Sequence, residues 1–390
     1  MKPTAIVLSA LALLAPAAVN AAPGVARSQA ITAIVQFDPH APGAARDALR
    51  THAGAQLTGA IPDLGLERIV VPAAALALYQ NSPLVRAVEQ TRTLYLMGRP
   101  NDPLLGLQWP LRTIDAFKAW PLEKPKAQVL VAVIDTGVDA THVDLEGRVG
   151  PGFDFLELDD DPYDDHGHGT HVSGIIAANM SNRTGIAGLS RGAQIIPIKA
   201  CAAGGACGIF EIYEGVVDAV QRGAEVINMS LGGAGECTAI DQLVYDYARG
   251  QGVLVVVAAG NSGKDGNPII TPADCDGTLG VGAIDQKGRK APFSSFGRFV
   301  DIAAPGVDVW STMPPLVTLR SPYLGYAPAS GTSMASPFVA AAAAAIKGKH
   351  PDWSPAQIEE RLLQTTVDAG PRGRDDLFGE GILNLHAALR

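Results

Sequence analysis

The stretch VLVAVID (129–135) decides the class of fold that this sequence predicts. Six apolar residues in a row end in Asp135, which is the pattern of a strand buried on both faces. Similar runs follow, separated by amphipathic helical segments, and such alternation is typical of a parallel sheet covered on both sides. We therefore predict an α/β fold with a mostly parallel, doubly wound sheet. The later strands and helices are expected at AQIIPIKA (193–200), 209–223, AEVINMSL (224–231), 238–252 and GVLVVVAAG (252–260).

The chain before this sheet has a different pattern. Residues 30–97 read as strand, helix, strand, helix, strand, which predicts a small α+β unit. The segment MGRPNDP (97–103) is rich in turn formers and marks an exposed boundary. Earlier still, Lys2, a short apolar run and small residues near Ala21 indicate a signal peptide, with a buried N-terminal strand as the alternative. We predict a signal peptide at 1–21, a second segment at 22–100 and the main domain at 101–390.

Composition narrows the classes of function. Of the 390 residues, 47% are hydrophobic and 18% charged, which is typical of a globular protein. The formal net charge of −9 and the lack of a Lys/Arg cluster argue against a nucleic-acid partner. No run after the signal peptide approaches the length of a membrane span, so we expect no membrane partner. The mature protein is expected to be exported, either secreted or periplasmic.

Four cysteines fit an oxidising compartment. Cys201 and Cys207 bracket a flexible AAGGA segment, so a local bridge between them is favoured, which leaves Cys237 with Cys275. Four cysteines allow three pairings, and the sequence cannot select one. A zinc site made of all four thiolates is the competing interpretation, but the spacings do not match the usual paired knuckles.

Polar residues follow several predicted strands. In parallel sheets ligands bind at the carboxyl ends of the strands, so residues at these positions are candidates for a site. Asp135 ends the first strand, and Asn261 follows the VVVAAG run. The third strand leads into Ser230, Leu231 and Gly232. Each of these residues could equally belong to an ordinary turn.

Three histidines crowd the segment DDHGHGTHVSG (164–174). His166, His168 and His171, beside two aspartates, suggest a hydrolytic zinc site. Ser-His-Asp catalysis would need only one of them, placed to bond a serine. Local spacing does not choose between these two chemistries.

The segment SGTSMASP (330–337) places Ser333 just before an alanine-rich run. We expect a helix over Val339–Lys349, with the small residues before it forming a tight turn. Ser333 could be a plain helix cap. It could also be a nucleophile, with backbone donors and the positive helix end facing developing negative charge.

Taken together, the motifs resemble those of the subtilisin-like serine peptidases, in order and nearly in spacing. They are VIDTGVDATHVDL, HGTHVSG, INMSLGG, AAGNSG, FSSFG, DIAAPG and SGTSMASP. The resemblance covers about residues 100–390, and a weaker one, to the family's inhibitory propeptide of ferredoxin-like fold, covers about 30–97. It implies that Asp135 orients His168, the general base, that Ser333 is the nucleophile and that Asn261 donates to the oxyanion. His171 then becomes a packed helix residue and His166 a loop residue.

The resemblance also implies what the protein does. It predicts a secreted serine endopeptidase that forms an acyl-enzyme, made as a zymogen that cuts itself in or near residues 95–102. The α+β unit would act as inhibitor and folding aid, and the mature enzyme would be a monomer acting on polypeptides. Ser230, Leu231 and Gly232 would form an edge on which an extended substrate adds as a strand, with the glycines leaving room for its side chains. An inactive relative that only binds peptides is the alternative.

Calcium is a separate expectation. The chemistry itself requires no cofactor, but the segment DFLELDDDPYDDHG is dense in oxygen ligands, which suit Ca²⁺. Asp154, Glu157, Asp159 and Asp161 have the spacing of a loop that binds calcium in some family members. A solvated acidic loop is the alternative. A second candidate pairs Asp144 with the loop NMSNRTG (179–185), which differs by about one residue from the family's form.

Overall fold

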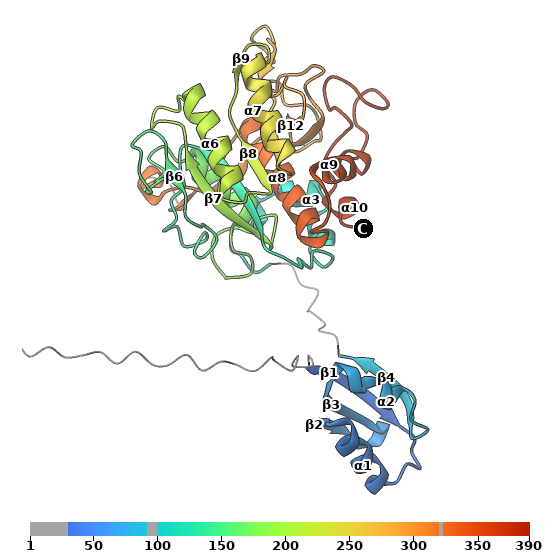
Figure 1. Ribbon diagram of the computed structural model, residues 1–390. Helices are drawn as coiled ribbons and strands as arrows, with labels where there is room; N and C mark the ends of the chain where they lie inside the picture. Colours follow the sequence, from blue (N-terminus) through green and yellow to red (C-terminus); the bar gives the residue numbers. More distant parts are fainter. Residues whose placement is uncertain (1–29, 92–99, 320–322) are drawn as a thin grey trace, which may run out of the picture. The chain divides into compact units, whose positions relative to one another are not determined.

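The structure, a computed structural model, describes residues 30–91, 100–319 and 323–390 (Figure 1). The chain divides into two compact units, Met1–Leu96 and Met97–Arg390. The predicted signal peptide and most of the predicted processing segment lie outside the described residues. Within them, no helix is long and apolar enough to cross a membrane.

The first unit is built on a four-stranded antiparallel sheet of order β2-β3-β1-β4. One strand was not predicted: β2 lies at the sheet edge, is mostly exposed and contains a register shift at Gly59, so its sequence carries little apolar alternation. The small α+β unit is confirmed. Its elements are β1 (Ala30–Phe37), α1 (Gly43–Ala53), β2 (Gln56–Ile61), η1 (Pro62–Leu64), β3 (Leu66–Pro72), η2 (Ala73–Ala75), α2 (Leu76–Gln80) and β4 (Val85–Gln90).

The second unit contains a seven-stranded sheet of order β13-β12-β10-β8-β5-β7-β6, in which all neighbours are parallel. This confirms the predicted fold class, and four of the strands lie where the sequence placed them. The strands are β5 (Val129–Asp135), β6 (Phe153–Asp154), β7 (Ala193–Lys199), β8 (Val226–Met229), β10 (Leu254–Ala258), β12 (Thr278–Ile284) and β13 (Ile302–Pro305).

Helices cover both faces of this sheet. On one face α5 (His168–Ala177) and α8 (Thr332–Lys349) pack against alternate strand residues such as Val131 and Val256. On the other, α6 (Ile209–Gln221) and α7 (Ala239–Gly250) pack against the residues between them. Because successive side chains of a strand point to opposite faces, strands buried on both sides must be apolar throughout, which is why they read as continuous runs.

Three strands of the sheet, β6, β12 and β13, were not predicted. The glycines of TLGVGAI interrupt the apolar pattern of β12, yet one of them is required by packing. A Cβ on Gly280 would lie 2.0 Å from the carbonyl oxygen of Phe299, so only glycine lets the chain approach this closely.

The helix that carries Ser333 begins earlier than expected. We predicted it over Val339–Lys349, but α8 begins at Thr332 and contains Pro337. Pro337 has no N–H to give to the carbonyl of Ser333, four residues earlier. The Ser230 hydroxyl donates to that carbonyl instead, at 2.8 Å, so a side chain from the neighbouring strand end supplies the missing bond.

The remaining elements surround the sheet. Two short antiparallel pairs, β9 with β11 and β14 with β15, lie outside the main sheet. The remaining helices and strands of this unit are η3 (Leu105–Leu107), α3 (Pro110–Thr113), α4 (Ala116–Ala119), β9 (Gly233–Ala234), β11 (Ile270–Thr271), β14 (Val309–Thr312), η4 (Pro315–Thr318), β15 (Tyr326–Ala329), α9 (Pro355–Gln364) and α10 (Leu385–Ala388).

Candidate active site

One cleft brings together residues from the ends of four elements. Asp135 is the last residue of β5, His168 the first of α5, and Ser333 the second of α8, while Asn261 follows β10. All four line the same cleft, as do Ser230, Leu231 and Gly232 after β8. The β5, β8 and β10 strands are direct neighbours, so their carboxyl ends meet at one edge of the sheet.

The buried Asp135 and the half-buried His168 form a hydrogen-bonded pair. The Nδ1–H of His168 donates to Asp135 Oδ1 at 2.7 Å, and the N–H of Thr136 donates to the same oxygen at 2.8 Å. Asp135 is 1% exposed, and its Oδ2 has no hydrogen-bond partner. Because the bond fixes the proton on Nδ1, Nε2 of the neutral ring is left with its lone pair.

The pKa of His168 lies above its ordinary value. Burial alone would lower it, but the negative charge of Asp135 and the hydrogen bond to it favour the imidazolium, and Asp164 adds to this. The net effect is a base that holds a proton more firmly than a free histidine.

Asp164 organises the start of α5, a role that the sequence analysis did not assign. It is fully buried, and its Oδ1 accepts from the N–H groups of His166 and Gly167 and from the Thr136 hydroxyl. Its Oδ2 accepts from the N–H and the hydroxyl of Thr170. This carboxylate therefore satisfies two otherwise unpaired backbone donors at the beginning of the helix, those of Gly167 and Thr170.

The other two histidines are not arranged with His168 around a metal. The Nε2–H of His171 donates to the carbonyl oxygens of Val309 and Ala327, and burial lowers the pKa of His171 to about 4. His166 is exposed. His166, His168 and His171 therefore do not form a group that could hold a metal ion.

Ser333 and Ser230 are joined by two reciprocal contacts. The Ser333 hydroxyl donates to the carbonyl of Ser230 at 2.9 Å, while the Ser230 hydroxyl donates to the carbonyl of Ser333. Ser230 is also held by the amide of Asn228 and lies 2.9 Å from the Ser336 hydroxyl. Ser230 thus fixes the start of α8 and accepts the hydrogen bond of the Ser333 hydroxyl.

Asn261 is oriented by Thr332. The Oδ1 of Asn261 accepts from the Thr332 N–H at 2.9 Å and from the Thr332 hydroxyl at 3.1 Å. Since the oxygen is occupied, the amide nitrogen faces away from Thr332 and can donate to a ligand. The Thr332 hydroxyl also accepts from the N–H of Gly260. Thr332 went unnoticed in the sequence because a threonine before a serine carries no signal of its own.

The residues of the predicted calcium loop bond mainly to their own backbone. Asp154 is 3% exposed, and its Oδ1 accepts from the N–H groups of Leu156 and Glu157. Asp159 accepts from the N–H of Asp161. Calcium binding by Asp154, Glu157, Asp159 and Asp161 stays a prediction.

The second calcium candidate, Asp144 with the loop 179–185, likewise stays a prediction. Both carboxylate oxygens of the fully buried Asp144 receive donors, from the side-chain amide of Asn182, the N–H of Ile186 and the hydroxyl of Tyr326. Burial raises the pKa of Asp144, against these hydrogen bonds.

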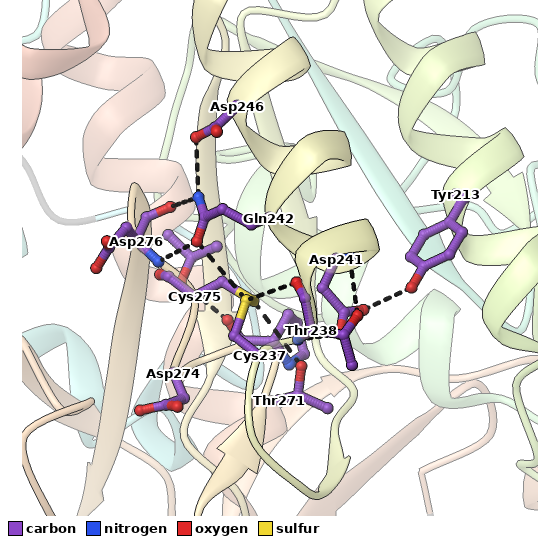
Figure 2. Close-up of a disulfide and its surroundings, with 12 residues drawn as sticks. Tyr213, Cys237, Thr238, Asp241, Gln242, Asp246, Thr271, Asp274, Cys275 and Asp276 are labelled. Carbon is purple, nitrogen blue, oxygen red and sulfur yellow. Dashed lines mark hydrogen bonds between the residues drawn. A yellow bond between two sulfur atoms is a disulfide. The ribbon is translucent and has the colours of Figure 1, made fainter.

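Both favoured disulfides are present. Cys201 pairs with Cys207 across a tight turn, and Cys237 pairs with Cys275, six and 38 residues apart in sequence. Figure 2 shows the second bridge between the start of α7 and the segment after β11. There Asp241 accepts from the Tyr213 hydroxyl at 2.6 Å and caps α7 through Thr238.

Known proteins of one family resemble this chain in sequence and in fold. The sequence model of the subtilase family matches residues 126–381. A thermophilic serine proteinase of Bacillus sp. (strain AK1) is 40% identical over 317 residues, covering 81% of this chain and 75% of the relative. Subtilisin DY of Bacillus licheniformis is 41% identical over 266 residues, covering 68% and 92%. Among solved structures, a protease from Pseudoalteromonas arctica gives a TM-score of 0.66 at 31% identity, covering 75% of this chain and 99% of the other.

Proposed function

The chain belongs to the subtilase family and is a serine protease of the subtilisin type, and from this premise we propose that it is a secreted endopeptidase whose triad is Asp135, His168 and Ser333. The observation that carries the assignment is the Asp135–His168 hydrogen bond of 2.7 Å in the cleft that Ser333 and Asn261 also line. An imidazole held by a buried carboxylate is the arrangement that makes a neighbouring hydroxyl nucleophilic.

Acylation follows from the positions of the groups. His168 Nε2 takes the proton of Ser333 as Oγ bonds to the peptide carbonyl carbon, and Asp135 stabilises the imidazolium. The carbonyl oxygen becomes an oxyanion, which accepts hydrogen bonds from the Asn261 amide and the N–H of Ser333 at the positive end of α8. When the C–N bond breaks, the proton passes from His168 to the leaving amine.

Deacylation repeats these steps with water. His168, neutral again, takes a proton from a water that attacks the ester carbon, and the same donors stabilise the second oxyanion. Breakage of the ester returns the proton to Ser333 Oγ and releases the carboxylic acid. Apart from the substrate and this water, every group in the proposed cycle belongs to the chain.

The test is hydrolysis of casein by the secreted protein and by Ser333→Ala, each with and without 1,10-phenanthroline. We expect the wild type to be active irrespective of this zinc chelator and the variant to be inactive. Hydrolysis by folded Ser333→Ala, or loss of activity with the chelator alone, would reject the serine mechanism in favour of a zinc one.

The N-terminal unit is proposed to be an inhibitory propeptide. Its support is the separate compact unit before residue 97 and the turn-rich sequence at 97–103. N-terminal sequencing of the active secreted protein should give a start in or near 95–102 for the wild type. The Ser333→Ala protein should retain the unit. A wild-type start near Ala22 would reject processing.

Export is supported by the sequence of residues 1–21 and by two disulfides, which persist in oxidising compartments. We propose a secreted or periplasmic monomer. Fractionation of cells and medium, with light scattering of the mature form, distinguishes these locations and detects any oligomer.

Calcium is proposed only as a structural ion near Asp154. Calorimetric titration of the mature protein with Ca²⁺ should release or absorb heat, and Asp154→Asn should remove it. An absence of binding heat at millimolar Ca²⁺ would reject the proposal.

A further inference from the structure

We propose that Ile270 closes the pocket for the substrate side chain next to the scissile carbonyl, so that the enzyme cleaves after glycine, alanine or serine. The inference rests on the proposed function, because it takes Ser333 and Asn261 as the groups that hold that carbonyl. It concerns which polypeptides are cut rather than how the bond is broken.

The positions of the reacting groups determine where this side chain goes. The attacked carbon lies at Ser333 Oγ and its oxygen at the Asn261 amide, while the substrate backbone runs along Ser230–Gly232. The side chain then enters between the segment that follows β8 and the segment that follows β10. These strands are parallel neighbours, with Met229 paired to Val257, so the two segments face each other as walls.

Ile270 occupies the space between these walls. A Cβ on Gly260 would lie 2.8 Å from Ile270 Cγ1, and a Cβ on Gly232 would lie 3.0 Å from Ile270 Cγ2. One isoleucine thus touches the glycine of each wall and lines the cleft, although it is only 3% exposed. The sequence suggested that such glycines leave room for substrate side chains, but much of the room is taken by Ile270.

The isoleucine is held where it is by covalent and hydrogen-bonded neighbours. In β11, Ile270 pairs with Ala234 and Thr271 with Gly233 of β9. The carbonyl of Ile270 accepts from the N–H of Asp274. The Cys237–Cys275 disulfide joins the segments that follow β9 and β11 (Figure 2). A large substrate side chain would therefore have to displace a braced, buried residue, which is costly in a close-packed interior.

Charge recognition does not replace size selection in this cleft. Among the described residues that line it, Asp241 is the acidic side chain besides Asp135. Its Oδ1 accepts from the Tyr213 hydroxyl, and its Oδ2 accepts from the N–H and hydroxyl of Thr238. A carboxylate already satisfied by these donors gains little from a lysine or arginine of the substrate.

The wild-type enzyme provides the first test, which does not depend on any variant folding. Peptide p-nitroanilides that differ only at the residue before the scissile bond would be compared by kcat/KM. We expect alanine to exceed phenylalanine about 100-fold, the range that pocket size can supply. Equal values, or a preference for phenylalanine, would overturn the inference, as would a preference for lysine, which would point to Asp241.

Ile270→Ala and Ile270→Gly provide the second test. Both should raise the phenylalanine-to-alanine ratio of kcat/KM at least about 10-fold, with glycine giving the larger change. This ratio is measured within one preparation, so partial unfolding does not affect it. Ile240→Ala, an exposed isoleucine on α7, is the control and should leave the ratio unchanged. An unchanged ratio in both Ile270 variants would overturn the inference.

Labelling with a fluorophosphonate separates this inference from the proposed function. Wild type that reacts at Ser333 but shows no size preference refutes the role of Ile270 alone. Folded, processed wild type that fails to react refutes the triad, and the pocket assignment falls with it.

Discussion

The two helices that carry His168 and Ser333 of the proposed triad, α5 and α8, differ in what their N-termini contact. At the start of α5, the buried carboxylate of Asp164 accepts from Gly167 and Thr170 and brings a full negative charge to the helix end. At the start of α8, the N–H of Thr332 donates to Asn261, whose amide is neutral. No side chain of the capping residue covers either end.

The difference matches the charge that each helix would meet in the proposed reaction. His168 on α5 becomes positive, and the nearby Asp164 favours that charge and helps raise the pKa of His168. Ser333 on α8 lies beside a developing oxyanion, which the uncompensated helix dipole and the Asn261 amide can stabilise. One helix end is neutralised within the protein, and the other stays available to the transition state.

Breaking the carboxylate side of the triad should have the largest effect. Asp135→Asn keeps the shape but no longer holds the proton on Nδ1 of His168 or stabilises the imidazolium. We expect kcat to fall about 10⁴-fold with a folded enzyme. Asp139→Asn, another buried carboxylate in the segment after β5, is the control and should change kcat less than 10-fold. A similar loss in both variants would contradict a specific role for Asp135.

The next test places a carboxylate beside the start of α8, as Asp164 lies beside the start of α5. Asn261→Asp can still accept from Thr332 but loses the amide donor and adds a negative charge. We expect kcat to fall at least 10²–10³-fold, with KM little changed. Asn261→Ala should lose less than Asn261→Asp, because it adds no charge. If the aspartate variant keeps more activity than the alanine variant, the oxyanion role is wrong.

Removing the charge of Asp164 beside the start of α5 should shift the pH profile of kcat/KM. His168 must be neutral to act as a base, and its raised pKa places the acid limb of kcat/KM above pH 6.5. Asp164→Asn removes a negative charge that raises this pKa, so the limb should move to lower pH. Asp165→Asn, an exposed neighbour paired with Lys199, is the matched control. A limb that stays in place for Asp164→Asn would refute this coupling.

The smallest effect, on the free energy of unfolding, is expected for two serine hydroxyls that donate to carbonyls of α8 and α5. Ser230→Ala leaves the Ser333 carbonyl without a donor, because Pro337 cannot supply one, and should cost about 2 kcal/mol of unfolding free energy. Ser311 donates to the carbonyl of His171 on α5, a helix without proline. Ser311→Ala should therefore cost only about 1 kcal/mol in urea titrations. A larger loss for Ser311→Ala would contradict the compensation for Pro337.

The sequence predicted the parts of the fold that depend on unbroken apolar runs. Strands β5, β7, β8 and β10 have such runs, whereas β12 is interrupted by glycines that serve close contacts made by distant residues. The predicted start of α8 was wrong because a proline such as Pro337 normally ends a helix. The Ser230 hydroxyl, which replaces the missing N–H of Pro337, lies 107 residues away from it in the sequence. Contacts over such separations leave no local pattern.

In the candidate site too, local motifs were predictable and contacts between distant residues were not. Motif positions suggested Asp135, His168, Asn261 and Ser333, and they line one cleft. Further residues shape the site through buried contacts that only the folded chain creates. They are Asp164, Thr332 and Ile270. Glycines in the sequence likewise indicated free space, but not which side chain fills it.

The most direct measurement of the central claim is fluorophosphonate labelling of the processed, folded protein, followed by peptide mapping by mass spectrometry. We predict a single adduct on Ser333, formed faster as pH rises through the pKa of His168, and no adduct on Ser333→Ala. An unlabelled wild type, or an adduct on another residue, would contradict it.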